Sequence, residues 1–290
     1  MSKRIVAGLD GSDASLAAAD WAAREAELHG ARLELVHVDD WPVNAPFAVP
    51  PAASRRQWSD GLLAGSRDRI LLRHPALEVA TRRIDGRAAA EGLTYAAGNA
   101  DMLVLGTRGL GSLAGFLVGS VGSAAVPTTV TPVVLVRPAD REAPPVQGDA
   151  GTVVLGLDPR SDCEPLLGFA CEEADRRGRP LVVVHAWPSP PAFAHALVMG
   201  QGLAQEITDA SAKELSELLA PWQQKYPRLA VEPRVVIGQP AVQVLDAAVG
   251  ASLVVVGRRI RRSAIGTHIG AITHAVMHHA ASPVAVVAHD

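Results

Sequence analysis

The sequence predicts an α/β fold that the chain builds twice, as two tandem domains that each contain a doubly wound parallel sheet of five strands. Three observations predict it. The chain has 290 residues, about twice the length of an average domain. The strand-like motif Ile5–Asp10 returns as Val153–Asp158, 148 residues further along. In each half, short apolar runs alternate with helical patterns, which is typical of a parallel sheet covered by helices.

The repeat extends through both halves of the chain. Leu35–Val38 matches Val183–Ala186 at the same offset of 148 residues, and Ala100–Gly106 matches Ala251–Gly257 at an offset of 151 residues. Because the offset drifts by only three residues, the two halves share one order of elements. The pattern therefore indicates a single fold that has been duplicated.

Domain boundaries follow from the repeat and from composition. The segment between the halves mixes prolines, Gly148 and charged residues, which is typical of an exposed connector. We predict a first domain over residues 1–138, a linker over 139–150 and a second domain over 151–290.

The first half contains five apolar runs of strand length, several of them rich in β-branched residues. These predicted strands are Arg4–Leu9, Leu33–Val38, Leu77–Ile84, Met102–Leu105 and Val133–Val136. A helix over 13–30 follows the first strand, with Asp13 as a possible N-cap and Gly30 at its end. Further helices are predicted over Ser54–Leu72, over Ala88–Ala97 and after Val118. The near-continuous apolar strands favour a sheet that is buried on both faces.

Composition excludes several classes of protein. Hydrophobic residues make up 48% of the chain, which excludes a disordered protein. The formal net charge of −3 argues against a dedicated nucleic-acid binder. Two cysteines, Cys163 and Cys171, suit a reducing compartment, and we expect both to be small buried residues rather than redox or metal ligands.

One uncharged segment, 109–136, is long enough to cross a membrane, and glycines within it follow GxxxG spacing. The segment also contains prolines, serines and threonines, which favour a loop that leads into a helix. A strand-like segment begins directly after Met1, without the apolar stretch of a signal peptide. We therefore expect a soluble, cytoplasmic protein with no membrane helix.

Ligands of open parallel sheets bind beyond the carboxyl ends of the strands. Asp10 follows the first predicted strand directly, and Gly106 and Gly109 follow the fourth. Gly119 and Ser120 lie at the expected start of the fourth helix, where backbone N–H groups suit phosphate oxygens. Each glycine taken alone is also consistent with a tight turn, which needs the conformational freedom of glycine.

The pattern Gly106-x2-Gly109-x9-Gly119-Ser120, with Asp10 at the end of the first strand, resembles the ATP-binding motif of the universal stress protein family. The two halves together cover nearly the whole chain, so the resemblance is to the tandem-domain class. It implies an adenine nucleotide α-hydrolase-like fold and the function of an ATP-binding regulator of the stress response.

The resemblance also implies roles for individual residues. An adenine pocket is formed by Gly8, Asp10 and the backbone of Val38, and ribose and phosphate contacts come from Leu105, Gly106, Gly109, Gly119, Ser120 and Val121. Arg108 is the nearest cation and could touch a phosphate, with a solvated loop arginine as the alternative. Asp10 is a candidate to hold Mg²⁺ through water, because Mg²⁺ usually binds a carboxylate together with phosphates. The alternative for Asp10 is a turn acid that caps the following helix.

Catalysis has little support in the sequence. It contains no GxxxxGK[ST] phosphate loop, no GxSxG elbow and no paired carboxylates with the spacing of an acid–base site. We therefore expect weak ATP hydrolysis at most. The alternatives to a regulator are a slow ATPase or nucleotidyl-transfer enzyme, and a nucleotide-free dimeric scaffold. No motif identifies a regulatory protein partner.

Assembly is predicted from the last strand of each half. Val133–Val136 and Val284–Val287 are short, apolar and terminal, so they are candidate sheet edges that need cover. In the family such strands pair between domains, and the tandem class commonly dimerises. The resemblance therefore implies halves that pack on a pseudo-twofold axis and a chain that forms a homodimer.

The second half departs from the motif. It keeps Asp158, Gly257 and Gly270. However, Ile260 stands in the place of Gly109, Ala271 replaces Ser120, and Pro159 follows the aspartate. We therefore predict about one ATP per chain, bound in the first half.

Other polar clusters have structural explanations. The second motif loop contains Arg258, Arg259, Arg261 and Arg262, for which we expect a solvated basic loop, with an anion site as the alternative. His274 and His278 have the i, i+4 spacing of two metal ligands, but no further ligand pattern supports a metal site. His37 and His185 occupy equivalent strand ends, where we expect hydrogen-bonded structural roles.

Overall fold

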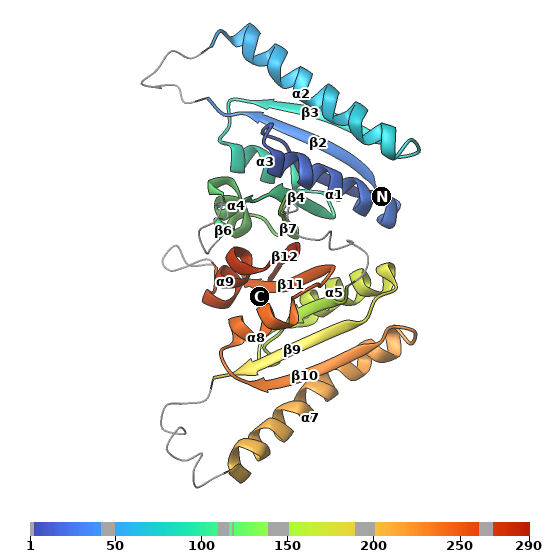
Figure 1. Cartoon of the computed structure of the whole chain (residues 1–290), viewed down its shortest axis with the longest axis vertical. Coiled ribbons are helices and arrows are strands. Elements are labelled where there is room, and N and C mark those ends of the chain that lie inside the picture. Colours follow the sequence, from blue (N-terminus) through green and yellow to red (C-terminus); the bar gives the residue numbers. More distant parts are fainter. Residues whose placement is uncertain are drawn as a thin grey trace. The chain divides into compact units, whose positions relative to one another are not determined.

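The structure is a computed structural model that describes residues 3–41, 50–109, 116–117, 119–138, 151–188, 201–260 and 269–290. The chain divides into two compact units, 1–143 and 144–290. The predicted linker, 139–150, lies outside the described residues. Each unit is an α/β sandwich around one parallel sheet (Figure 1).

The first unit follows the predicted alternation of strands and helices. Its elements are β1 (Arg4–Gly8), α1 (Asp13–His29), β2 (Arg32–Asp39), α2 (Ala52–Arg73), β3 (Val79–Asp85), α3 (Ala89–Ala97), β4 (Met102–Gly106), β5 (Arg108–Gly109), β6 (Phe116–Leu117), α4 (Ser120–Ala125), the 3₁₀ helix η1 (Val126–Thr128) and β7 (Val133–Val136). The sheet order is β7-β4-β1-β2-β3, with all neighbours parallel. The short strands β5 and β6 form a separate antiparallel pair.

The second unit repeats this plan. Its elements are β8 (Val153–Gly156), α5 (Glu164–Arg177), β9 (Leu181–Trp187), α7 (Gln201–Lys225), β10 (Val231–Ile237), α8 (Pro240–Ala247), β11 (Leu253–Arg259), α9 (Ala271–His279) and β12 (Val284–His289). The sheet order is β12-β11-β8-β9-β10, again parallel throughout. The predicted fold class, two tandem doubly wound sheets of five strands, is confirmed.

Helix α1 shows how the sequence sets its own boundaries. Its N-cap is Ser12, one residue before the predicted Asp13, because the Ser12 hydroxyl accepts a hydrogen bond from the Ser15 N–H at 3.2 Å. At the other end, Gly30 takes a left-handed conformation with φ 57°, and its N–H reaches the carbonyls of the last turn. Both ends of the helix therefore satisfy backbone groups that would otherwise lack partners.

The core of each unit lies on both faces of its central strands. Ile5, Val6 and Ala7 of β1 are fully buried, as are Val153 and Val154 of β8. Each fully buried Val or Ile side chain contributes about 1.5–3 kcal/mol through removal of its apolar surface from water. Burial on both faces explains why these strands are continuous apolar runs rather than alternating ones.

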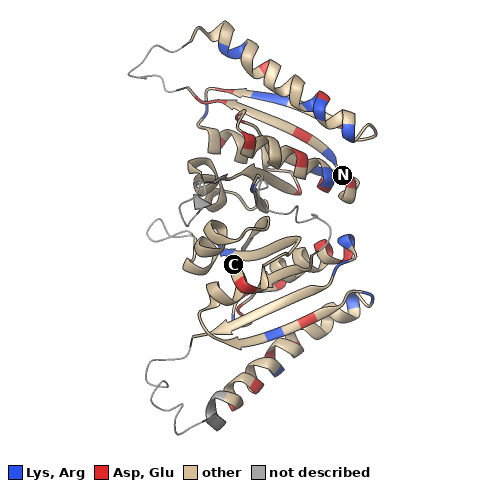
Figure 2. Cartoon of the chain, in the orientation of Figure 1, with Lys and Arg blue, Asp and Glu red and all other residues tan. Residues whose placement is uncertain are grey.

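The outer strands β3 and β10 differ in the side chains that they present beneath the long helix of their unit. In β3, Arg83 pairs with Asp60 of α2 at 2.7 Å and with Asp85 at 3.2 Å. Val235 and Ile237 of β10 correspond to Arg83 and Asp85, because they have the same register against β9 that those two residues have against β2. Both positions of β10 are therefore apolar. Figure 2 shows the basic residues on β3 and α2.

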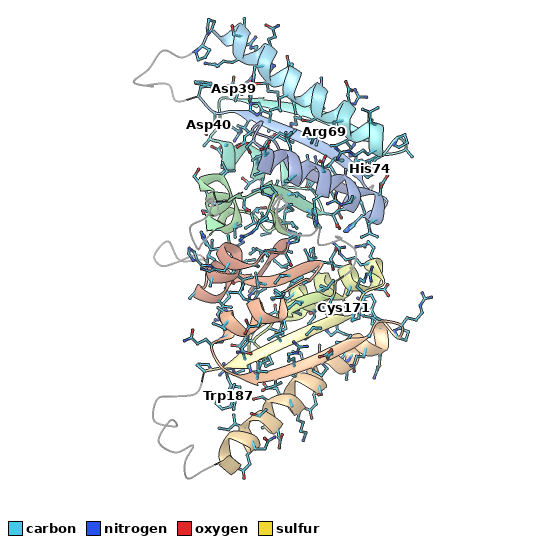
Figure 3. All side chains as sticks on the ribbon, in the orientation of Figure 1. Asp39, Asp40, Arg69, His74, Cys171 and Trp187 are labelled. Atoms are coloured by element: carbon cyan, nitrogen blue, oxygen red, sulfur yellow. The ribbon has the colours of Figure 1, made fainter. Side chains whose placement is uncertain are left out.

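Two smaller expectations concern the helices. Cys163 and Cys171 are both free and buried, as predicted (Cys171 is labelled in Figure 3). Burial raises the pKa of the Cys171 thiol to about 11 and also raises that of Cys163. Within the described ranges, no helix is both long enough and apolar enough to cross a membrane. Residues 110–115 and 118 of the predicted loop lie outside those ranges.

Candidate functional site

A cavity of about 130 Å³ lies at the carboxyl ends of β1, β2 and β4 in the first unit. Its lining residues are Gly8, Leu9, Asp10, Ser12, Ser15, Val38, Ala89, Leu93, Leu105, Gly106, Gly119, Ser120, Val121 and Gly122. Eight of the ten predicted site residues are therefore gathered around one cavity. The volume is below the 300–1,000 Å³ typical of small-molecule sites, so a whole nucleotide would occupy the cavity together with its open mouth.

The other two predicted site residues, Arg108 and Gly109, follow the end of β4. They form β5, which pairs with β6 in the register Arg108 to Leu117 and Gly109 to Phe116. The chain therefore leaves the parallel sheet after Thr107 and turns into a small hairpin, which sequence spacing alone does not reveal.

Asp10 organises the turn between β1 and α1. Its Oδ1 accepts hydrogen bonds from the Ser12 N–H at 2.9 Å and the Ser12 hydroxyl at 2.5 Å. The Asp10 N–H donates to Ser15 Oγ at 3.3 Å. Asp10 therefore acts as a turn acid, the alternative considered for it above: it orients Ser12, and Ser12 caps α1. Because Asp10 also lines the cavity, the same carboxylate remains placed for a ligand.

The backbone of Val38 faces the cavity because β2 continues past the end of β1. The Leu9 N–H donates to the Val36 carbonyl at 2.8 Å, so the peptide groups of alternate β2 residues point towards β1. Two residues further, Val38 directs its peptide groups to the same side, beyond Gly8. Its carbonyl also accepts from the Asp40 N–H at 3.0 Å, and a carbonyl has two lone pairs.

Helix α3 closes one wall of the cavity and is held in place from β2. The Asp40 carboxylate accepts a hydrogen bond from the Ala89 N–H at 2.9 Å, which satisfies a free donor in the first turn of α3. Figure 3 shows Asp39 and Asp40 at the end of β2. Ala89 and Leu93, four residues apart on one helix face, then line the cavity. Sequence reasoning missed this wall, because only the fold brings α3 to the end of β2.

Gly106 and Gly119, two glycines of the motif, have different structural roles. A Cβ at Gly106 would lie 2.4 Å from the carbonyl carbon and oxygen of Ala14, so this glycine permits close contact between β4 and α1. A Cβ at Gly119 would meet no atom within 4 Å. Gly119 is the N-cap of α4, as predicted, and leaves open space beside the cavity. Since α4 has only six residues, its dipole is modest and local N–H groups matter more.

The equivalent region of the second unit is built differently. β11 continues to Arg259 in register with His289 of β12, and the Ile260 N–H donates to the His289 carbonyl at 2.6 Å. Leu166 and His289 side chains fill the space beside Gly257, each with an atom 2.7 Å from a Cβ placed there. The strand therefore runs straight through the point where the first unit turns away.

Asp158, the counterpart of Asp10, pairs with a guanidinium instead of a serine. Arg160 Nε lies 3.1 Å from Asp158 Oδ1. Partial burial acts to raise the pKa of Asp158, but hydrogen bonds and charge from Arg160 outweigh it and lower the pKa. The carboxylate is thus occupied by its own neighbour in the sequence.

The predicted basic loop is only partly correct. Arg259 is exposed, whereas Arg258 is buried and donates to the Arg259 carbonyl at 3.4 Å, so the expectation of a solvated side chain is wrong for Arg258. Its burial lowers the pKa of Arg258. Arg261 and Arg262 lie outside the described residues.

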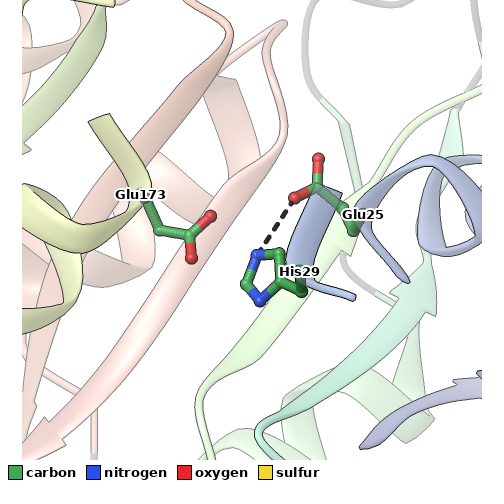
Figure 4. A group of neighbouring side chains, drawn as sticks. All are labelled: Glu25, His29 and Glu173. Carbon is green, nitrogen blue, oxygen red and sulfur yellow. Dashed lines mark ion pairs between the residues drawn. The ribbon is translucent and has the colours of Figure 1, made fainter. Parts of the chain in front are cut away.

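The histidines have structural roles where the structure tests them. His37 Nδ1 lies 2.8 Å from the Leu9 carbonyl, and His185 Nδ1 lies 3.1 Å from the Leu157 carbonyl, which confirms the prediction of equivalent hydrogen bonds. The ring centroids of His274 and His278 lie 4.3 Å apart. The two rings are therefore close together, as their i, i+4 spacing predicts. Elsewhere, His29 of α1 lies 3.6 Å from the carboxylate of Glu25 one turn earlier (Figure 4).

Comparison with known proteins agrees with the residue pattern. The profile of the universal stress protein family matches residues 1–137 and 150–288. A universal stress protein of Mycobacterium tuberculosis is 33% identical, over 97% of this chain and 94% of its own length. One from Mycolicibacterium smegmatis is also 33% identical, over 98% and 96%. Among solved structures, a universal stress protein of Archaeoglobus fulgidus matches with a TM-score of 0.72 at 16% identity, over the full length of both chains.

Proposed function

Because the chain belongs to the universal stress protein family, we propose that its first unit binds ATP with Mg²⁺ at the carboxyl ends of β1, β2 and β4. The bound nucleotide stabilises one conformation of the chain, through which the protein regulates a response to stress. The observation that carries the proposal is one cavity whose lining comes from distant parts of the sequence. These parts are the Asp10 turn, the end of β2 and the helix start at Gly119 and Ser120.

The inner part of the cavity suits an adenine base. Val38, Leu93 and Leu105 supply apolar walls, and Gly8 leaves room between them. Beyond Gly8, the Val38 N–H faces the base edge, where adenine presents a ring nitrogen as an acceptor. An apolar slot with one or two directed backbone groups is the usual composition of a small-molecule site.

The mouth of the cavity suits phosphates that arrive with a metal ion. Ser120 offers a hydroxyl group, and Gly119 leaves its surroundings open. The hydroxyl protons of Ser12 and Ser15 are already donated, to Asp10 Oδ1 and to the Ser12 carbonyl. Among the lining residues that the structure describes, none is a lysine or an arginine. The charge of the phosphates therefore requires a cation, and the Asp10 carboxylate fits the preference of Mg²⁺ for one carboxylate, phosphates and water.

The same composition favours binding over turnover. The described part of the lining contains no lysine, arginine or histidine that could stabilise a transferring phosphoryl group or move a proton. Asp10 is already engaged with Ser12. We therefore propose that hydrolysis is slow at most, and that the second unit, with Arg160 on Asp158 and β11 continued through the loop, does not bind ATP.

Isothermal titration calorimetry with MgATP tests the proposal. We expect about one ATP per chain, and mass spectrometry of the purified protein to detect co-purifying nucleotide. Asp10→Asn keeps an acceptor for Ser12 but removes the charge, so it weakens MgATP binding about tenfold, a change of about 1.4 kcal/mol. Asp158→Asn is the matched control and leaves binding unchanged. No heat of binding in the unsubstituted chain refutes the function, and two ATP per chain refute the difference between the units.

The homodimer remains a prediction of the same proposal. Light scattering at micromolar concentration is expected to give twice the chain mass of 30.3 kDa. A mass of one chain, with and without MgATP, contradicts it.

A further inference from the structure

One large aromatic side chain packs against the outside of the Asp10 turn. Trp58 projects from α2, and its six-membered ring lies 3.1 Å from the position that a Cβ would take on Gly11. Gly11 has φ 82°, a left-handed conformation that disfavours any other residue. A side chain at Gly11 would therefore be strained and would also crowd the indole.

The same indole contacts a second part of the site. Its ring meets His37 edge to face, with centroids 5.3 Å apart and an interplanar angle of 72°. His37 in turn holds the Leu9 carbonyl at 2.8 Å. Leu9 and Asp10 both line the cavity, so Trp58, which is not among the lining residues, is linked to one of them through His37 and to the other through Gly11.

The second unit shows which of these contacts the fold requires. His185 makes the same bond, to the Leu157 carbonyl, without an aromatic contact among the described residues. Pro159 occupies the place of Gly11, and the corresponding part of α7, residues 207–213, contains no aromatic residue. The fold therefore forms without the indole and its glycine, and the two occur together at the cavity of the first unit.

We infer that Trp58 is a positioning residue for the nucleotide site, an inference that rests on the function proposed above. Its ring limits the conformations of the Asp10–Ser12 turn, so that the Asp10 carboxylate is held in place before a ligand arrives. Trp58 is 54% exposed, and the part of its ring that faces Gly11 lies beside the residue that directly follows Asp10, the metal-binding candidate. Occupancy of the cavity therefore changes the surroundings of this indole.

The expected effects separate positioning from general stability. Trp58→Ala frees the turn and raises the dissociation constant for MgATP about tenfold. Trp58→Phe keeps an aromatic ring against Gly11 and stays within about threefold of the unsubstituted chain. Trp222→Ala is the matched control, because Trp222 packs against Gly168 and Tyr226 in the second unit; MgATP binding does not change.

Tryptophan fluorescence distinguishes a positioning role from a purely structural one, because only a residue beside the site is expected to respond to bound MgATP. The chain has five tryptophans, so the emission of Trp58 is obtained as the difference between the unsubstituted chain and Trp58→Phe. We expect MgATP to change that difference spectrum with the dissociation constant found by calorimetry, and to leave the difference spectrum for Trp222→Phe unchanged. If Trp58→Ala does not fold, as judged by circular dichroism, the fluorescence titration decides alone.

The outcomes distinguish the two proposals. Absence of MgATP binding to the unsubstituted chain refutes the proposed function, and this inference with it. Binding that is unchanged in a folded Trp58→Ala variant, or a Trp58 difference spectrum that does not respond to bound MgATP, refutes the positioning role and leaves the function intact.

Discussion

Gly106→Ala is expected to destabilise the first unit severely, although the substitution adds a single methyl group. That methyl would lie 2.4 Å from the carbonyl carbon and oxygen of Ala14 and 2.7 Å from the Ser15 nitrogen. All three are backbone atoms in the first turn of α1. They cannot yield by a change of rotamer, so either β4 or the start of the helix must move.

The magnitude follows from what that movement breaks. Overpacking a filled site costs about 1–3 kcal/mol, and backbone on both sides places this case at about 3 kcal/mol or above. A shift of α1 also strains the Ser12 cap and the hydrogen bond between the Asp10 N–H and Ser15. For a unit of this size, about 1 kcal/mol corresponds to roughly 2–4 °C, so the melting temperature falls by roughly 6–12 °C.

Gly119→Ala is the matched control, since it alters another glycine that lines the same cavity but adds a methyl with no neighbour within 4 Å. It replaces an N-cap glycine by alanine, which costs about 0.5–1 kcal/mol and so remains well below the cost expected at Gly106. Thermal unfolding followed by circular dichroism, with hydrogen exchange of the β1 and β4 amides to identify the first unit, measures both variants. If Gly106→Ala melts within about 1 °C of the unsubstituted chain, the packing explanation for this glycine is wrong.

Three further predictions concern stability and reactivity. Ser12→Ala removes the cap of α1 and the partner of Asp10, and we expect a loss of about 1 kcal/mol in urea unfolding of the first unit; an unchanged midpoint contradicts the assigned cap. The pKa of Cys171 is raised from 9.0 to about 11, so the folded thiol keeps its proton where the unfolded one loses it. The free energy of unfolding is therefore unaffected by this thiol below pH 9, and it falls by about 3 kcal/mol at most as the pH rises to 11. Denaturant titrations of Cys171→Ala and of the unsubstituted chain across this pH range measure the effect as a difference. For the same reason Cys171 should resist iodoacetamide at pH 8 in the folded chain, and rapid labelling there would contradict its burial.

The sequence predicted the fold well because the signals were local and occurred twice. The His37 and His185 positions are an example: equivalent histidines at equivalent strand ends make the same bond to the preceding strand. Helix ends were also accessible, to within a residue at Ser12 and at Gly30.

The site was harder to predict, because its walls depend on contacts between distant segments. Gly106 matched a ligand-binding motif, yet its close neighbour is Ala14 of α1, and sequence does not distinguish close approach to a helix from close approach to a ligand. Arg108 and Gly109 belong to a hairpin whose partner strand, β6, carries no pattern of its own. Trp58 gives no local signal either, since only the packing of α2 brings it to Gly11.

The contrast between β3 and β10 has a consequence for how the chain avoids misassembly. A polypeptide that encodes one topology twice can, while it folds, insert a strand from one half into the vacant position of its counterpart. At the outer position such an exchange would mismatch side chains. Arg83 would give up its ion pair with Asp60 and take the place of Val235, while Val235 would leave Asp60 without its cation. Because Asp60 is exposed, this ion pair contributes about 1 kcal/mol or less, so the two edge strands give the native arrangement a modest advantage over the exchanged one.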